Sequence, residues 1–135
     1  MPSRDAWYDG WWGRDRNAGA PMEVEVFGTK KSAETRKALR FFGERRVKTH
    51  FVDLSQRPAS IGELTRFAQK FGVSALVDRA SPRFAALGLG TSHLSDTGWL
   101  EKLVEEPLLL RQPLVRSGSH IGIGCDETLW KEWLV

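Results

Sequence analysis

The stretch Glu23-Val-Glu-Val-Phe-Gly-Thr-Lys-Lys-Ser-Ala-Glu-Thr-Arg-Lys-Ala38 decides the fold. Polar and apolar residues alternate from Glu23 to Phe27, which predicts a strand with one buried face. A short turn, Gly28 to Lys31, follows. Ser32 then has the side chain of a good N-cap for a helix from Ala33 to Glu44. Strand, tight turn and capped helix form the first two-thirds of a βαβ unit.

The second strand of that unit is expected at Val47 to Leu54, and such crossovers are nearly always right-handed. The later expected elements are a helix capped by Ser60 and ending near Phe71, helical pieces at Val73–Val77 and Arg83–Leu87, a helix capped by Ser95 and ending near Glu106, a β-hairpin of Leu114–Ser117 and His120–Ile123, and a helix capped by Asp126 and running through Leu134. This order predicts an α/β, thioredoxin-like fold. It has a small mixed sheet of about four strands flanked by helices, with a helical insertion between the βαβ half and the ββα half.

Composition fits one domain, residues 22–135, preceded by a Trp-rich arm, residues 1–21. The chain has 135 residues, with 20 Lys and Arg against 17 Asp and Glu, for a net charge of +3. Because this excess is small and dispersed, we expect no direct nucleic-acid binding. No apolar run approaches the roughly 20 residues of a membrane span, and the N-terminus lacks the apolar core of a signal peptide. We therefore expect a soluble cytoplasmic protein.

Cysteine and histidine usage argues against a metal site. Cys125 is the single cysteine, which rules out an intramolecular disulfide framework and a cysteine-built metal site. His50, His93 and His120 are widely separated and show no ligand spacing. No metal is predicted.

The arm contains half of the six tryptophans, at Trp7, Trp11 and Trp12. Three interpretations stay open. The arm folds back onto the domain because exposed tryptophans are costly in water. Alternatively, it docks onto a partner, since Trp is a favoured interface anchor. In the third, translation starts later, at Met22.

Four segments in the same order resemble the arsenate reductase and Spx (ArsC-like) family, over Met22 to Val135. They are Phe27–Ala38, Leu76–Leu89, Pro107–Val115 and Gly122–Trp130. The resemblance implies a thioredoxin-like fold, and a cis-proline at Pro113 that faces the first helix. It also places the family's nucleophilic cysteine at Ser32 and the second cysteine of Spx at Thr35.

These positions depart from the family pattern. Thiol–disulfide exchange needs a thiolate that attacks sulfur, and the Ser32 hydroxyl has neither the pKa nor the redox couple for it. The arginine that the reductases carry before their proline is Gln112 here, with Arg111 one residue earlier. A second oxyanion-binding arginine aligns with Asp78, next to Arg79. On a strand, a shift of one residue turns a side chain to the opposite face, so we do not expect arsenate reduction by the family's mechanism.

Two local features could still carry chemistry. Backbone N–H groups at the start of the first helix, with Lys30, Lys31 and Arg36 nearby, could hold an anion; alternatively, Ser32 only caps the helix and the lysines are solvated. Cys125 is the single candidate nucleophile. It could be reactive, because it precedes a helix start whose dipole would lower the pKa of the thiol. Alternatively, it is a buried structural residue, and the adjacent carboxylates of Asp126 and Glu127 oppose ionisation of the thiol.

The sequence therefore predicts a redox-inactive member of the family that acts by binding, as a regulator or accessory protein. In Spx-like relatives the insertion half contacts RNA polymerase, so an RNA polymerase-type or other protein partner is expected. The predicted partner-binding residues are Trp7, Trp11 and Trp12, and the predicted ligand or anion groove is Thr29, Lys30, Lys31, Ser32, Arg36, Arg79, Arg111, Gln112 and Pro113. No cofactor is required. The alternative is an arsenate reductase-like, glutathione-dependent thiol oxidoreductase that uses Cys125 or the thiol of bound glutathione.

Overall fold

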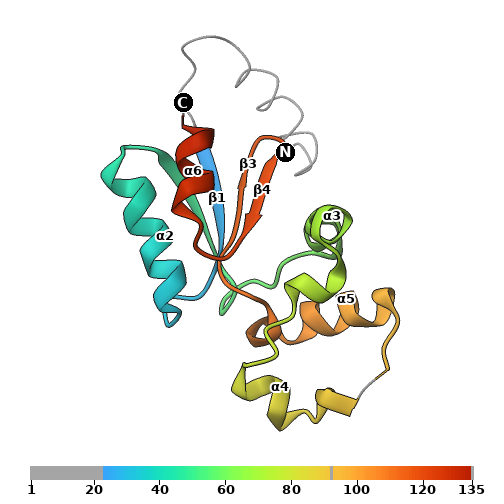
Figure 1. The fold of residues 1–135 in the computed structure, drawn as a ribbon. Helices are drawn as coiled ribbons and strands as arrows, with labels where there is room; N and C mark the ends of the chain where they lie inside the picture. Colours follow the sequence, from blue (N-terminus) through green and yellow to red (C-terminus); the bar gives the residue numbers. More distant parts are fainter. Residues whose placement is uncertain (1–22, 92, 135) are drawn as a thin grey trace.

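Strand β1 (Glu23–Gly28) lies at the centre of the fold, as the alternating stretch predicts. The computed structural model describes residues 23–91 and 93–134, so the predicted arm and its three tryptophans lie outside the described residues. The elements that follow β1 are α2 (Ala33–Glu44), β2 (Lys48–Asp53), α3 (Ile61–Phe71), η1 (Val73–Leu76), α4 (Pro82–Ala86), η2 (Leu89–Thr91), α5 (Asp96–Glu105), η3 (Pro107–Leu109), β3 (Leu114–Ser117), β4 (His120–Ile123) and α6 (Glu127–Trp133) (Figure 1).

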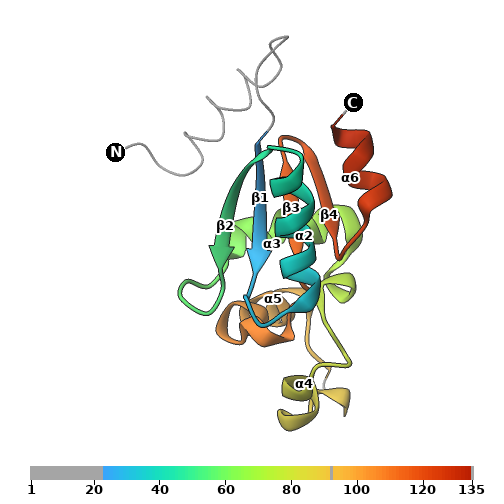
Figure 2. The ribbon, with the colours of Figure 1, turned by 90° about the vertical axis from the view of Figure 1, so that its left-hand side faces the viewer.

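The four strands form one mixed sheet in the order β2-β1-β3-β4. Strand β1 pairs in parallel with β2 and antiparallel with β3, and β3 pairs antiparallel with β4. Helices α2 and α6 cover one face of the sheet, and α3 and α5 lie on the other (Figure 2). The predicted α/β, thioredoxin-like fold, with its helical insertion between the two halves, is confirmed.

Helix starts follow the predicted caps. Ser32 Oγ accepts a hydrogen bond from Thr35 N at 3.2 Å. Ser60 forms a capping box with Glu63, in which each side chain accepts from the other residue's backbone N–H. Asp126 Oδ1 accepts from Leu129 N at 3.1 Å. Because each cap satisfies an otherwise orphaned N–H group, these residues fix where the helices begin.

The expectation of one buried face for β1 is wrong, because both faces are covered. Val24 and Val26 pack with Trp130 on the α2 and α6 side. Phe27 packs into the larger cluster formed with the insertion helices α3 and α5. The polar residue Glu25 is only 6% exposed, so the polar–apolar alternation does not separate buried from exposed positions here.

The Trp130 indole anchors the smaller of the two cores. It is fully buried, and its ring centroid lies 5.1 Å from that of Phe41 and 5.0 Å from that of Phe42. Helix α6 is thereby fixed against α2. Within the described part of the chain, no helix combines the length and the apolar character that crossing a bilayer requires.

Candidate functional site

The loop between β1 and α2 meets the chain segment that leads into β3. The Gln112–Pro113 peptide bond is cis, as the resemblance implies, and Pro113 is buried. Gly124 N donates a hydrogen bond to Pro113 O at 2.8 Å, which ties the end of β4 to the same place. Residues from the two halves of the domain therefore converge at the carboxyl end of β1.

The Gln112 side chain is the centre of this site. Its Oε1 accepts from Thr29 N at 2.8 Å and from Thr29 Oγ1 at 3.1 Å. Thr35 Oγ1 makes a longer hydrogen bond to the same oxygen, at 3.4 Å. Thr29 and Thr35 are both buried. One neutral amide oxygen thus links the loop, the first turn of α2 and the segment before the cis-proline.

Close packing of β1 against the first turn of α2 requires glycine at position 28. A Cβ at this position would collide with Thr35 Oγ1 and would lie 2.7 Å from Thr35 Cγ2. Real Cβ atoms do not approach other atoms so closely, so β1 and α2 pack at this distance only because residue 28 has no side chain.

Ser32 uses its hydroxyl as a structural group. Its Oγ accepts from Thr35 N, and its backbone N–H donates to Thr29 O at 3.1 Å. The side chain is half-buried. The oxygen at the predicted cysteine position is therefore the N-cap of α2.

The basic residues predicted for the groove lie in different surroundings. Arg36 Nη1 donates to Lys30 O at 2.6 Å, so it braces the loop, while the Lys30 and Lys31 side chains are exposed. The Arg79 guanidinium lies over two rings of the insertion, 5.5 Å from the Phe84 centroid and 6.0 Å from that of Trp99. Arg111 is exposed, and its backbone N–H donates to Leu76 O. Of the predicted set, the structure brings together Thr29, Ser32, Gln112 and Pro113.

Cys125 follows Gly124 at the end of β4 and is half-buried. It packs against the core on the α2 and α6 face. Burial raises the pKa of its thiol; the Glu34 carboxylate raises it further, and Lys37 opposes this. Since the thiolate is the reactive form, this environment makes Cys125 a weaker nucleophile at neutral pH than an ordinary cysteine.

A cavity of about 490 Å³ opens beside the loop. Its lining residues are Thr29, Lys30, Lys31, Asp53, Leu54, Ser55, Pro107 and Leu108. Hydrogen bonds from the Ser55 side chain and backbone lower the pKa of Asp53, and Lys30 adds to this shift. The Leu108 side chain is 55% exposed. The cavity therefore has cations, one carboxylate and exposed apolar surface.

A sequence model of the ArsC family matches residues 27–133. The chain belongs to the ArsC family. It is 23% identical over 115 residues to YusI of Bacillus subtilis (strain 168), covering 82% of this chain and 98% of YusI. Its fold is similar to that of the YFFB (PA3664) protein, with a TM-score of 0.77 and 19% identity over 83% of this chain and 99% of the other. It is also similar to an arsenate reductase from Vibrio cholerae, with a TM-score of 0.73 and 23% identity over 83% and 98% of the two chains.

Sequence reasoning missed part of the cavity of this ArsC family protein. Asp53 and Ser55 could have been predicted to lie near the β1–α2 loop, because the parallel strands β1 and β2 end at the same edge of the sheet. Leu108 had a weaker signal, an apolar run directly after Pro107. Thr35 was singled out only through the family resemblance, and nothing in the sequence indicates its hydrogen bond to Gln112.

The remaining site predictions can be placed briefly. Trp7, Trp11 and Trp12 lie outside the described residues. Over residues 23–91 and 93–134, no three His, Cys, Asp or Glu side chains gather in a group that could hold a metal ion.

Proposed function

We propose that this ArsC family protein acts in the cytoplasm by binding a protein partner, in a regulatory or accessory role, without thiol turnover at Ser32. One observation carries the proposal. The side chains at the positions where the resemblance places a cysteine and an arginine hold the structure together: Ser32 caps α2, and Gln112 accepts from Thr29 and Thr35.

Chemistry at this position would need an electron donor. Reduction of an oxyanion or a disulfide takes two electrons, which a thiol supplies through sulfur oxidation and a serine hydroxyl does not. An arginine before the cis-proline would add a fixed positive charge for an oxyanion, whereas Gln112 is neutral and its oxygen is already an acceptor. Both features support binding rather than turnover.

The cavity beside the loop offers the docking surface. Leu108 and Pro107 provide apolar area on η3, and the exposed Lys30 and Lys31 line the same cavity. An apolar patch rimmed by charge is typical of protein-binding surfaces. A partner with an acidic segment beside an apolar anchor would match it, and the resemblance to Spx points to RNA polymerase as the first protein to test.

The experiment measures binding of the purified full chain to purified RNA polymerase, together with affinity isolation from native cell extract. Leu108→Asp should abolish the specific interaction. Ile61→Asp is the matched control, because Ile61 is also an exposed apolar residue, at 47%, but does not line the cavity. A chain that captures nothing in either format, or equal capture by both variants, would contradict the proposal.

The alternative function is that of a glutathione-dependent thiol oxidoreductase. Its support is the cavity itself, since about 490 Å³ lies within the usual range for small-ligand sites and Lys30 and Lys31 could pair with the carboxylates of glutathione. The Lys30→Gln, Lys31→Gln double variant should then lose glutathione binding in calorimetry. Glutathione binding that depends on these lysines, with turnover of a small disulfide, would favour the enzyme.

A further inference from the structure

Basic residues are concentrated on one segment of this chain. Residues 30–48 contain eight Lys and Arg against two Glu, a net charge of +6, whereas the whole chain has +3. The eight cations are Lys30, Lys31, Arg36, Lys37, Arg40, Arg45, Arg46 and Lys48, and each of these residues is exposed. The segment comprises the loop before α2, α2 itself and the turn into β2. The excess of positive charge is therefore not dispersed, as composition alone suggested.

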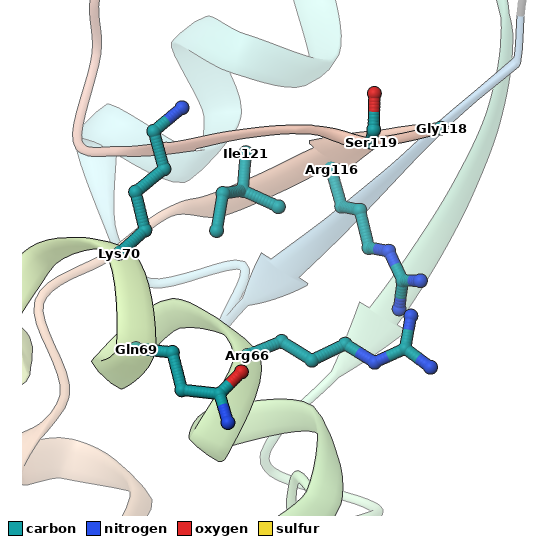
Figure 3. Close-up of a pocket in the computed structure, with 7 residues that line it drawn as sticks. All are labelled: Arg66, Gln69, Lys70, Arg116, Gly118, Ser119 and Ile121. Carbon is teal, nitrogen blue, oxygen red and sulfur yellow. The ribbon is translucent and has the colours of Figure 1, made fainter.

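Several basic side chains elsewhere in the fold already have partners. Arg83 donates two hydrogen bonds of 2.8 Å to the Glu106 carboxylate. Arg66 and Arg116, which extend toward each other at a cavity beside the hairpin (Figure 3), also have interaction partners. The charges of these arginines are used within the fold.

Arg36, Arg40 and Arg46 differ, because the ion pairs formed among residues 23–91 and 93–134 include none of them. Arg36 Nη1 donates to the backbone oxygen of Lys30, a neutral acceptor that leaves the charge of the guanidinium uncompensated. Arg36, Arg40 and Gly43 follow one another at spacings of four and three, so they form one stripe along the exposed face of α2. Arg46 follows directly after the end of the helix.

Two positions of this surface depart from ordinary helix chemistry. Gly43 is exposed in the last turn of α2, and a Cβ there would meet nothing within 4 Å, so alanine would fit and would favour the helix. Arg46 has a left-handed backbone, with φ at 57°, at the position after the C-cap where glycine is usual. Its N–H donates to Gly43 O at 3.1 Å, and Val47 N–H donates to Phe42 O at 3.0 Å, as in a Schellman motif. Such departures from local stability rules are typical of functional positions.

Carboxylates border the stripe. Glu34 and Glu44 lie on α2 itself, and Asp126 and Glu127 lie at the start of α6. Glu34, Asp126 and Glu127 each raise the pKa of the Cys125 thiol, so they lie together beside the first turn of α2. A nucleic acid or an anionic lipid surface would meet these carboxylates together with the arginines. A narrow occupant aligned with the stripe avoids them.

We propose that the exposed face of α2 binds an acidic α-helix of a partner protein, aligned with Arg36, Arg40 and Gly43. Glutamates three or four residues apart lie on one face of a helix, so they can pair with the arginines, whose guanidinium forks match carboxylates. The absence of a side chain at Gly43 lets the two helix backbones approach closely, because interhelical distance depends on the side chains at the contact. None of these residues lines the cavity beside the β1–α2 loop, so this surface is separate from the one proposed above.

The test titrates ¹⁵N-labelled full-length protein with a synthetic alanine-based peptide, held helical by a hydrocarbon staple, that carries glutamates along one face. A control peptide of the same composition has its glutamates distributed around the helix. We expect saturable shifts of the Arg36, Arg40 and Gly43 amide signals, with tighter binding of the striped peptide. Equal affinity for the two peptides, or no saturable shift, would overturn the proposal. Tighter binding of a short DNA duplex or of phosphatidylglycerol vesicles at these amides would also overturn it, because the face would then be specific for phosphates.

Two variants separate binding from folding, because both should stabilise the protein. Gly43→Ala should raise the urea midpoint of unfolding yet weaken binding of the striped peptide about tenfold, since its methyl group prevents the close approach. Arg46→Gly should also raise the midpoint, by relieving the left-handed backbone, and should weaken binding about threefold through loss of one ion pair. Gly62→Ala is the matched control on α3, where a Cβ would meet only Ser60 Oγ at 3.9 Å, and should leave the affinity unchanged. Unchanged affinity in Gly43→Ala, or an equal loss in Gly62→Ala, would overturn the proposal.

Discussion

The two ends of the sheet solve the problem of buried polar groups in opposite ways. At the cis-proline end, neutral side chains hydrogen-bond to one another: Gln112 Oε1 is shared by Thr29 and Thr35. At the hairpin end, charged side chains face each other across the sheet, with Glu25 opposite Arg116. The cis-proline end contains Ser32, where the resemblance places the family's nucleophilic cysteine. The resemblance implies no functional residue at the hairpin end.

The two ends therefore differ in how their buried polar side chains contribute to stability. A neutral network that satisfies itself leaves little hydrogen-bonding capacity for a ligand, and its removal is expected to cost folding free energy. Oppositely charged side chains on neighbouring strands, such as Glu25 and Arg116, depend instead on each other's charge. Substitutions in the neutral network at the cis-proline end should therefore change stability, whereas substitutions at the exposed hairpin turn should change it little.

The largest effect is expected at Gly28. Gly28→Ala places a Cβ against Thr35, and such overpacking should lower the free energy of unfolding by about 3 kcal/mol. Thr35→Ala removes the colliding atoms, so the double variant should be less destabilised than the sum of the single variants. Urea unfolding of all four proteins measures this coupling. Strict additivity would show that β1 and α2 are not in tight contact.

Gln112→Ala is the next largest change. It leaves Thr29 N and the Thr29 hydroxyl without their acceptor, at a cost of about 2 kcal/mol for the buried donors. Gln112→Glu keeps an acceptor oxygen and should lose less. Ser119→Ala, at the exposed hairpin turn, should change stability by under about 0.5 kcal/mol. If Gln112→Ala and Ser119→Ala unfold at the same urea concentration, the contrast between the two ends fails.

Ser32→Ala should cost about 1 kcal/mol, the usual value of a lost N-cap. Ser32→Asp retains an acceptor and adds a negative charge at the positive end of α2, so it should be close to wild type. Ser95→Ala in α5 is the control for an ordinary cap. Thermal unfolding with matched urea curves gives the comparison. A wild-type stability for Ser32→Ala would remove the structural role assigned to this hydroxyl.

The smallest expected effect is on the reactivity of the Cys125 thiol. Because burial and nearby carboxylates raise the pKa of Cys125, its alkylation by iodoacetamide should be slower at pH 7 than that of an ordinary cysteine, and the midpoint of its pH dependence should lie at higher pH. Ser32→Cys in a Cys125→Ser background places a thiol at the start of α2, where the helix dipole favours the thiolate. Its alkylation midpoint should lie at lower pH. The reverse order of midpoints would make Cys125 the reactive position.

Most of the fold could be predicted because local signals and the chain order agree. The caps Ser32, Ser60 and Asp126 mark helix starts that the structure reproduces to within a residue. The burial of Glu25 could not be predicted, since it depends on the insertion helices covering the second face of the sheet. Local periodicity contains no information about which distant segment will do so.

The candidate site was less accessible to sequence reasoning. Ser32, Gln112 and Pro113 were placed together through the family resemblance, and the structure brings them together. Arg79 was expected in the groove, but its guanidinium lies over the Phe84 and Trp99 rings of the insertion. The contact with Trp99 joins residues 20 positions apart and has no local sequence pattern. Arg66 of α3 and Arg116 of β3 line one cavity although they lie about 50 residues apart in the chain, and no local pattern predicts this proximity.

The most direct test of the central claim is turnover of arsenate and of a small disulfide with glutathione as reductant. Wild type and Cys125→Ser should both match the rate without protein, because no sulfur occupies the position of the family's nucleophile. Turnover by wild type that disappears in Cys125→Ser would contradict the account, since it would show that the single cysteine performs the redox step.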